Sequence, residues 1–269
     1  MVEVFRRYSD DQSGVLAGYI AYAAMLAGLP FLIFTITLAG VMIGETYSTE
    51  AVQALFAAVP MHVAQTLEPV LGEVIGQRRE GILTVALLGT IYAASNGVDA
   101  IRIGLDRAYD VETPRSFIMN RIVAIIFVGL CFLAFGSLAV LIIFAPLAFN
   151  IIEQVTAVDI PASADVARYL VGAVLLYAIF WLMHRLLPAR QMRDMKVWPG
   201  ITISILIWGI LASLMSVYLA YAPSYALTYG ALSGVIVTLL FFYLTGVAII
   251  FGAQVNAVVN FGLGHREKI

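Results

Sequence analysis

A stripe of polar and charged residues interrupts an otherwise apolar stretch that ends at Tyr109. On a 3.6-residue period these residues fall on one side of a continuous helix: Tyr92, Ser95, Asn96, Asp99, Arg102, Asp106 and Tyr109. A polar or charged group in hydrocarbon costs several kcal/mol unless it faces protein, water or a partner. We therefore expect the stripe to face the inside of a helix bundle or a water-filled entrance.

Two interpretations of the stripe remain open. In the first, the helix continues out of the membrane, and Arg102 pairs with Asp99 at i,i+3 and with Asp106 at i,i+4. In the second, the stripe forms a cytoplasmic mouth or substrate site in which Asn96 and Asp99 lie deepest. Arg102 would then bind a phosphate or carboxylate through its forked guanidinium.

A second polar element lies near the end of the last apolar run, at Gln254 and Asn256. Its expected depth matches that of Asp99 and Arg102, so the two elements could form one substrate-binding cluster. The alternative is that each amide satisfies a neighbouring helix. Tyr225 and Tyr229 fall near the opposite interface, where they form either an aromatic belt or an outer mouth.

The sequence lacks the common signatures of catalysis and of cofactor binding. His62, His184 and His265 are far apart and have no metal-ligand spacing. There is no Walker loop and no GxSxG elbow. The sequence therefore predicts that the protein is not an enzyme and needs no metal or other cofactor.

The composition places the chain among membrane proteins, because 62% of its 269 residues are hydrophobic and only 12% are charged. A membrane-spanning helix needs about 20 mostly apolar residues. Six segments satisfy this requirement: Val15–Gly44, Gly81–Ile101, Ile122–Phe149, Val166–Leu187, Val197–Tyr221 and Tyr229–Val259. We therefore expect an all-α, polytopic protein in which residues 1–269 form a single membrane domain.

The longest connection between the expected spans, Glu45–Glu80, has apolar residues at helical spacing and polar residues largely off that face. We expect amphipathic helices here, on the outer side of the membrane. They would either seal the bundle or form an outer gate or a dimer contact.

The basic residues are distributed unevenly across the expected topology. If the N-terminus is cytoplasmic, twelve of the 15 basic residues lie in cytoplasmic segments. The positive-inside rule then predicts six spans with both termini in the cytoplasm. Small residues four apart, at Gly14/Gly18, Gly40/Gly44 and Gly230/Gly234, would permit close helix approach and suggest a homodimer.

Four sequence elements resemble the YihY/BrkB family of bacterial inner-membrane proteins, once mislabelled as ribonuclease BN. They are AYAAMLAGLPFLIF, YAASNGVDAIRIGLDRAYDVETPRSF, MHRLLPARQMRDMKVWPG and YALTYGALSGVIVTLLFFYLTGVAIIFGAQVNA, and together they cover nearly the whole chain. The chain departs from the family pattern at three places. Asp106 stands where members often have Asn, Gln254 where they often have Glu, and Ala27 and Gly28 where they often have a serine before the proline.

The resemblance implies six helices, an inner-membrane location, and a part in transport or envelope homeostasis. Our leading hypothesis is a transporter-like protein that moves a solute, an anion or a lipid-like amphiphile. The second is a non-transporting scaffold in envelope or lipid homeostasis. The chain has no nuclease carboxylate cluster and no soluble basic groove, so we expect neither ribonuclease activity nor a nucleic-acid partner; membrane lipid is the partner we do expect.

Overall fold

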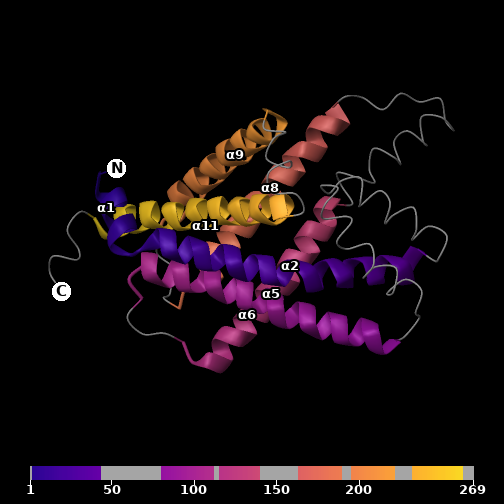
Figure 1. Cartoon of the computed structure of the whole chain (residues 1–269). Helices are drawn as coiled ribbons and strands as arrows, with labels where there is room; N and C mark the ends of the chain where they lie inside the picture. Colours follow the sequence, from indigo (N-terminus) through magenta and orange to yellow (C-terminus); the bar gives the residue numbers. More distant parts are fainter. Residues whose placement is uncertain are drawn as a thin grey trace.

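The computed structural model describes residues 2–43, 80–111, 115–139, 163–189, 195–221 and 232–262. In these ranges the chain is helical and contains no strand (Figure 1), in agreement with the expected all-α class. The helices are α1 (Val2–Asp10), α2 (Ser13–Ile43), α5 (Glu80–Ala108), α6 (Phe117–Ala139), α8 (Ser163–Leu186), α9 (Trp198–Tyr221) and α11 (Leu232–Phe261).

The long helices coincide with the expected apolar spans to within a few residues at most described ends. Four of them, α6, α8, α9 and α11, contain stretches long and apolar enough to cross a membrane, and α2 contains a shorter apolar stretch at Ser13–Gly28. α5 continues seven residues beyond the expected span, from Ile101 to Ala108. Residues 45–79 of the expected amphipathic segment lie outside the described residues.

Several helix ends that are far apart in the sequence lie together at one end of the bundle, which we call the terminal end. Figure 1 shows the start of α1 and the end of α11 there. Hydrogen bonds at this end join α1 to the ends of α5 and α11, and the end of α8 to the segment before α6. Successive long helices therefore run in alternating directions between the terminal end and the opposite end.

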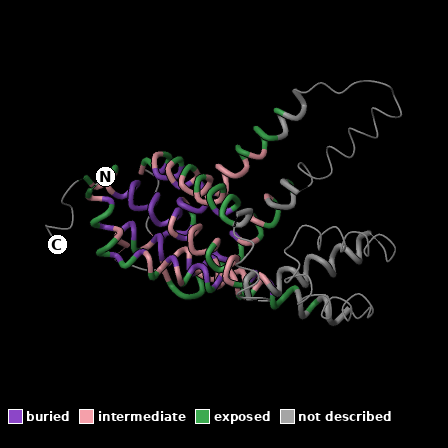
Figure 2. The backbone as a smooth tube through the Cα atoms, turned by 45° about the horizontal axis from the view of Figure 1, so that its top comes forward, coloured by how far each residue is buried: buried purple, intermediate pink, exposed green. Residues whose placement is uncertain are grey.

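The core is concentrated near the terminal end, where Figure 2 shows most of the buried residues. One apolar cluster includes Leu105, Phe127, Leu187 and Ile201 and so joins α5 and α6 to α8 and α9. A second cluster packs α2 against α5 and α11 around Ile20. Many large apolar side chains of α6 and α8 remain exposed, as expected for helices that face lipid.

Among the described glycines, Gly200 and Gly252 make the closest contact between helices, and neither belongs to a pair that the spacing suggested. A Cβ on Gly252 of α11 would lie 1.9 Å from Ser204 Oγ and 2.4 Å from the carbonyl oxygen of Gly200 on α9. By contrast, a Cβ on Gly14 would lie no nearer than 3.6 Å to its neighbours, and one on Gly18 would meet nothing within 4 Å. Within the chain, neither Gly14 nor Gly18 is crowded by a neighbouring helix, and the homodimer contact that this pair suggested stays a prediction. The other two pairs reach beyond the described residues.

Candidate functional site

The N-terminal half of the polar stripe on α5, from Tyr92 to Asn96, contacts the neighbouring helix α6. Arg121 of α6 donates to Asn96 Oδ1 over 2.7 Å, and its guanidinium carbon lies 4.7 Å from the centre of the Tyr92 ring. Ser95 is buried, and its hydroxyl donates to the Tyr92 carbonyl over 2.8 Å. This half of the stripe therefore forms a packed polar contact between two helices.

The C-terminal half of the stripe, from Asp99 to Asp106, forms consecutive ion pairs along α5. Arg102 Nε lies 2.8 Å from Asp99 Oδ1, and Arg102 Nη1 lies 2.5 Å from Asp106 Oδ2. The two pairs that the spacing predicts are both present. Asp106 also accepts the backbone N–H of Ala189 over 2.8 Å, which ties α5 to the segment that follows α8. Burial raises the pKa of the Asp106 carboxyl, although the Ala189 N–H and Arg102 act in the opposite direction.

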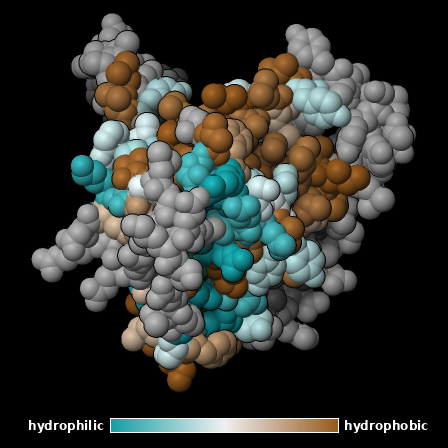
Figure 3. Space-filling view, turned by 90° about the vertical axis from the view of Figure 1, so that its left-hand side faces the viewer, coloured by the Kyte–Doolittle hydropathy of each residue, from teal (hydrophilic) through white to brown (hydrophobic). Residues whose placement is uncertain are grey.

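A cavity of about 980 Å³ opens at the terminal end, between the α1–α2 turn and the end of α5. Figure 3 looks onto this end and shows hydrophilic residues gathered at its centre beside a hydrophobic area. The lining residues are Asp10, Asp11, Gln12, Val15, Leu16, Arg102, Ile103, Asp106, Arg107, Asp110 and Val111. Of the residues predicted for the site, Arg102 and Asp106 therefore line this cavity, and the deeper Asn96 and Asp99 do not.

A buried arginine, Arg7 of α1, binds both neighbouring helices behind this cavity. It is 2% exposed and donates to Asp110 Oδ2 over 2.5 Å, to the carbonyl oxygen of Ala108 over 3.3 Å and to Gln254 Oε1 over 3.2 Å. Gln254 Nε2 in turn donates to Asp11 Oδ2 over 2.6 Å. Gln254 is therefore part of a charged network with α1.

A second buried network joins four helix ends around Asn256. Its Nδ2 donates to the Tyr109 hydroxyl over 3.2 Å, and its Oδ1 accepts the Gly200 N–H over 2.6 Å. The Tyr109 oxygen lies 2.7 Å from His184 Nδ1. Burial raises the pKa of Tyr109 well above its usual range, so its phenol stays protonated. This network locks α5, α8, α9 and α11 together.

The predicted cluster of Gln254 and Asn256 with Asp99 and Arg102 does not form. In the described ranges, no hydrogen bond or ion pair joins the first two residues to the last two. Gln254 and Asn256 instead bind groups near the ends of other helices. This is the alternative that the sequence left open.

Several residues of these networks carried no role in the sequence reasoning. Arg7 and Asp11 counted only as charges before the first span, although their i,i+4 spacing places them on one helix face. His184 counted only as an isolated histidine; its Nε2 is buried and has no hydrogen-bond partner in the part that the structure describes. Tyr225 and Tyr229 lie outside the described residues.

No metal site is present within the described ranges, where no three His, Cys, Asp or Glu residues come together in a way that could hold an ion. The networks at the terminal end combine arginine, carboxylate, amide, hydroxyl and imidazole groups.

Comparison with known proteins places this arrangement in a family. A family model described as virulence factor BrkB matches residues 4–268. The chain belongs to the BrkB family. Because the match covers both ends of the described bundle, all the networks above lie within the BrkB family region.

Relatives of this BrkB family protein carry two kinds of name. The ribonuclease-like protein YfkH of Bacillus subtilis strain 168 is 29% identical over 260 residues, which cover 96% of this chain and 94% of the relative. A UPF0761 membrane protein of Idiomarina loihiensis is 25% identical over 92% of this chain and 86% of the relative. One from Alteromonas mediterranea is 21% identical over 93% and 83%. No solved structure matches this chain.

Proposed function

We propose that this BrkB family protein is a transporter-like inner-membrane protein with six membrane-crossing helices and both termini in the cytoplasm. The alternating directions of α2, α5, α6, α8, α9 and α11 support an even number of crossings. The terminal end then faces the cytoplasm, in keeping with the excess of basic residues in the segments on that side. The proposed role is not catalytic, and it involves no nucleic acid.

The observation that carries the proposal is the charged cavity at the terminal end. Its walls hold both acidic residues, such as Asp106 and Asp110, and basic residues, such as Arg102. Apolar side chains, including Leu16 and Ile103, line other parts of the wall. Such a mixed surface suits a small solute with charged groups, or the headgroup of an amphiphile.

Thiol labelling tests whether this cavity is a water-filled entrance. Single cysteines at Ile103 and Val111, which line the cavity, are introduced into a Cys131→Ala background and treated with a membrane-impermeant reagent in oriented vesicles. Cysteines at Ala100 and Leu105, which are buried elsewhere on α5, are the matched controls. We expect rapid labelling of the first two and protection of the controls.

A cargo would be found by its ability to slow this labelling. Organic phosphates, carboxylates and zwitterions are added in turn, and a solute that occupies the cavity should protect Ile103→Cys without changing the label at an exposed site outside the cavity, such as Arg6→Cys on α1. If Ile103→Cys is labelled as slowly as Leu105→Cys, the cavity is closed to water and the transport proposal is wrong.

A scaffold function is the second candidate, and the paired state of the stripe favours it. Asn96 already binds Arg121, and Arg102 already binds two carboxylates, so a cargo would have to displace these partners to bind either side chain. A scaffold would copurify with a stable partner after cross-linking in native membranes. A homodimer is one such assembly, and it would appear as a cross-linked species of twice the chain mass.

A further inference from the structure

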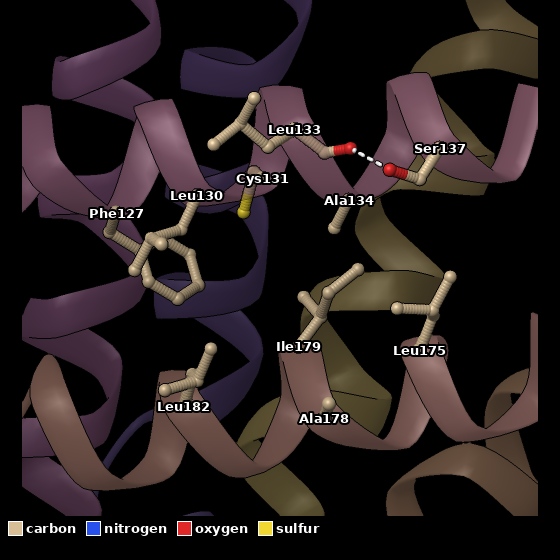
Figure 4. Close-up of a pocket in the computed structure, with 10 residues that line it drawn as sticks. All are labelled: Phe127, Leu130, Cys131, Leu133, Ala134, Ser137, Leu175, Ala178, Ile179 and Leu182. Carbon is tan, nitrogen blue, oxygen red and sulfur yellow. Dashed lines mark hydrogen bonds between the residues drawn. The ribbon is translucent and has the colours of Figure 1, made fainter.

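One charged residue, Arg121, lies in α6, within a stretch that is apolar and long enough to cross a membrane. Toward α8, this helix lines an apolar cleft of about 280 Å³, where Leu130, Cys131 and Ile179 lie and no charged side chain takes part (Figure 4). Arg121 instead lies where α6 meets α5. A charge in a membrane-spanning helix is costly unless a partner or water compensates it, so such a residue marks a candidate binding site.

The contacts of Arg121 with α5 are with neutral groups. Its Nη1 donates to Asn96 Oδ1 over 2.7 Å, and its guanidinium carbon lies 4.7 Å from the centre of the Tyr92 ring. Within the described ranges no carboxylate forms an ion pair with Arg121, whereas Arg102 on α5 pairs with two. The positive charge of Arg121 therefore has no countercharge in the part of the chain that the structure describes.

The rest of the guanidinium is open to the surroundings of the bundle. Arg121 is partly exposed, and its Nε and Nη2 groups bind no atom of the described residues, although neither atom is fully buried. Phe117 and Ile125, one turn before and one turn after it on α6, are exposed apolar side chains, and Tyr92 is 65% exposed. The free N–H groups therefore lie on the lipid-facing surface between α5 and α6.

The depth of Arg121 places it close to the headgroups of one leaflet. α6 begins at the terminal end with Phe117, and Arg121 lies four residues, or about 6 Å, further along. On α5, Asn96 lies five residues, or about 8 Å, before Ile101, where the expected span ends. Both helices thus place the contact just inside the hydrocarbon. An arginine stem is long enough to bring its charged head from this depth to the lipid phosphates.

We propose that Arg121 binds the phosphate group of an anionic phospholipid in the leaflet at the terminal end. The Nε and Nη2 groups form one edge of the guanidinium fork and can donate to two phosphate oxygens. Asn96 and Tyr92 act as positioning residues, because they hold the opposite edge and the face of the guanidinium. The lipid supplies the countercharge that the described chain lacks. The site does not depend on transport, and a scaffold with the same fold would hold the same lipid.

Photo-cross-linking in lipid nanodiscs tests the site with the full-length chain. The probe is phosphatidylglycerol with a diazirine on an acyl chain close to the glycerol, and the comparison probe is phosphatidylcholine with the same chains. Cross-linked peptides are mapped by mass spectrometry. We expect phosphatidylglycerol to label α5 and α6 around Arg121 several times more strongly than phosphatidylcholine does. On the other lipid-facing surfaces the two probes should label equally.

Matched variants test whether the charge of Arg121 causes this preference. Arg121→Gln should lower the ratio of the two labels about fivefold, and Arg121→Lys, which keeps the charge, should retain much of it. Asn96→Asp keeps the side-chain size and places a carboxylate next to Arg121, so the chain itself would supply the countercharge and the ratio should fall as in Arg121→Gln. Arg6→Gln, which removes an exposed charge on α1, is the control and should leave the ratio unchanged.

Two results would overturn the proposal directly. They are equal labelling around Arg121 by the two lipids and a ratio that Arg121→Gln leaves unchanged; if Arg121→Gln does not fold, an unchanged ratio in Asn96→Asp decides in the same way. Loss of the label on addition of inorganic phosphate would assign Arg121 to a soluble anion. A cross-linked homodimer that Arg121→Gln abolishes, with the lipid ratio unchanged, would assign it to a contact between copies. The thiol-labelling outcome at Ile103 affects none of these results, so the two proposals fail independently.

Discussion

Arg7 is held at the terminal end by groups from two other helices. Its guanidinium binds the Asp110 carboxylate, the Ala108 carbonyl and the Gln254 amide. A buried ion pair stabilises a fold weakly relative to apolar residues, but the loss of one partner leaves the other buried without compensation. Arg7 therefore keeps α1 docked, and its removal affects the groups behind the charged cavity directly.

Arg7→Leu should destabilise the protein strongly. The substitution keeps an apolar stem but removes the buried guanidinium that donates to Asp110 and Gln254, which costs about 3 kcal/mol. The matched control is Arg6→Leu, because Arg6 is 49% exposed and pairs with Glu3 on the same helix; such a pair contributes about 0–1 kcal/mol. Thermal unfolding in nanodiscs measures both. Equal shifts for the two variants would contradict a structural role for the buried network.

At the scale of helices, α9 and α11 make backbone contact where two glycines face each other. The Gly200 N–H is also bound by Asn256 Oδ1, so a polar contact fixes the register at which the glycines meet. Small residues permit such close approach between membrane helices, where packing replaces the hydrophobic effect. This crossing holds the start of α9 against the end of α11 and so keeps the Gly200 N–H within reach of Asn256.

Gly252→Ala should disrupt this crossing. Its Cβ would lie 1.9 Å from Ser204 Oγ, so either the hydroxyl or the helix must move. Overpacking of this kind costs about 1–3 kcal/mol. The control is Gly209→Ala on α9, where a Cβ meets nothing within 4 Å and the better helix propensity gives up to about 1 kcal/mol. Thermal unfolding of the two variants should shift in opposite directions, and a neutral Gly252→Ala would show that the helices do not touch there.

For the whole molecule, hydropathy predicted the positions of the long helices, because the thickness of the membrane fixes the length of an apolar span. The expected starts at Val15 and Val197 lie within two residues of the starts of α2 and α9. The ion pairs of Arg102 were also predictable, because i,i+3 and i,i+4 neighbours on one helix meet in any fold. The end of the bundle at which Gln254 lies was predictable as well, because it follows from the order of the apolar spans along the chain.

The partners of these residues could not be predicted in the same way. Successive residues of a helix point about 100° apart, so depth alone does not tell which neighbour Gln254 faces. Its partners, Arg7 in the short helix α1 and Asp11 in the turn after it, precede the first span, where hydropathy gives no signal. The same uncertainty applies to glycines, because 22 of them occur in the sequence and only the packed faces reveal which ones meet another helix.

The alternating helix directions make a prediction about how the whole bundle lies in the membrane. With Cys131→Ala as background, single cysteines at Gln12 and Lys196 report on the terminal end, and one at Val166 reports on the opposite end. In intact spheroplasts an impermeant thiol reagent should label only Val166→Cys, because basic residues are concentrated at the terminal end and stay in the cytoplasm. After lysis, all three should react. Labelling of Gln12→Cys before lysis would show that the topology is inverted and that the charged cavity lies outside the cell. Labelling of only one of Gln12→Cys and Lys196→Cys would show that α1 and the start of α9 lie on different sides of the membrane. Agreement of those two sites is the stricter requirement, since the Arg7 and Asn256 networks bring both helix ends into one polar layer.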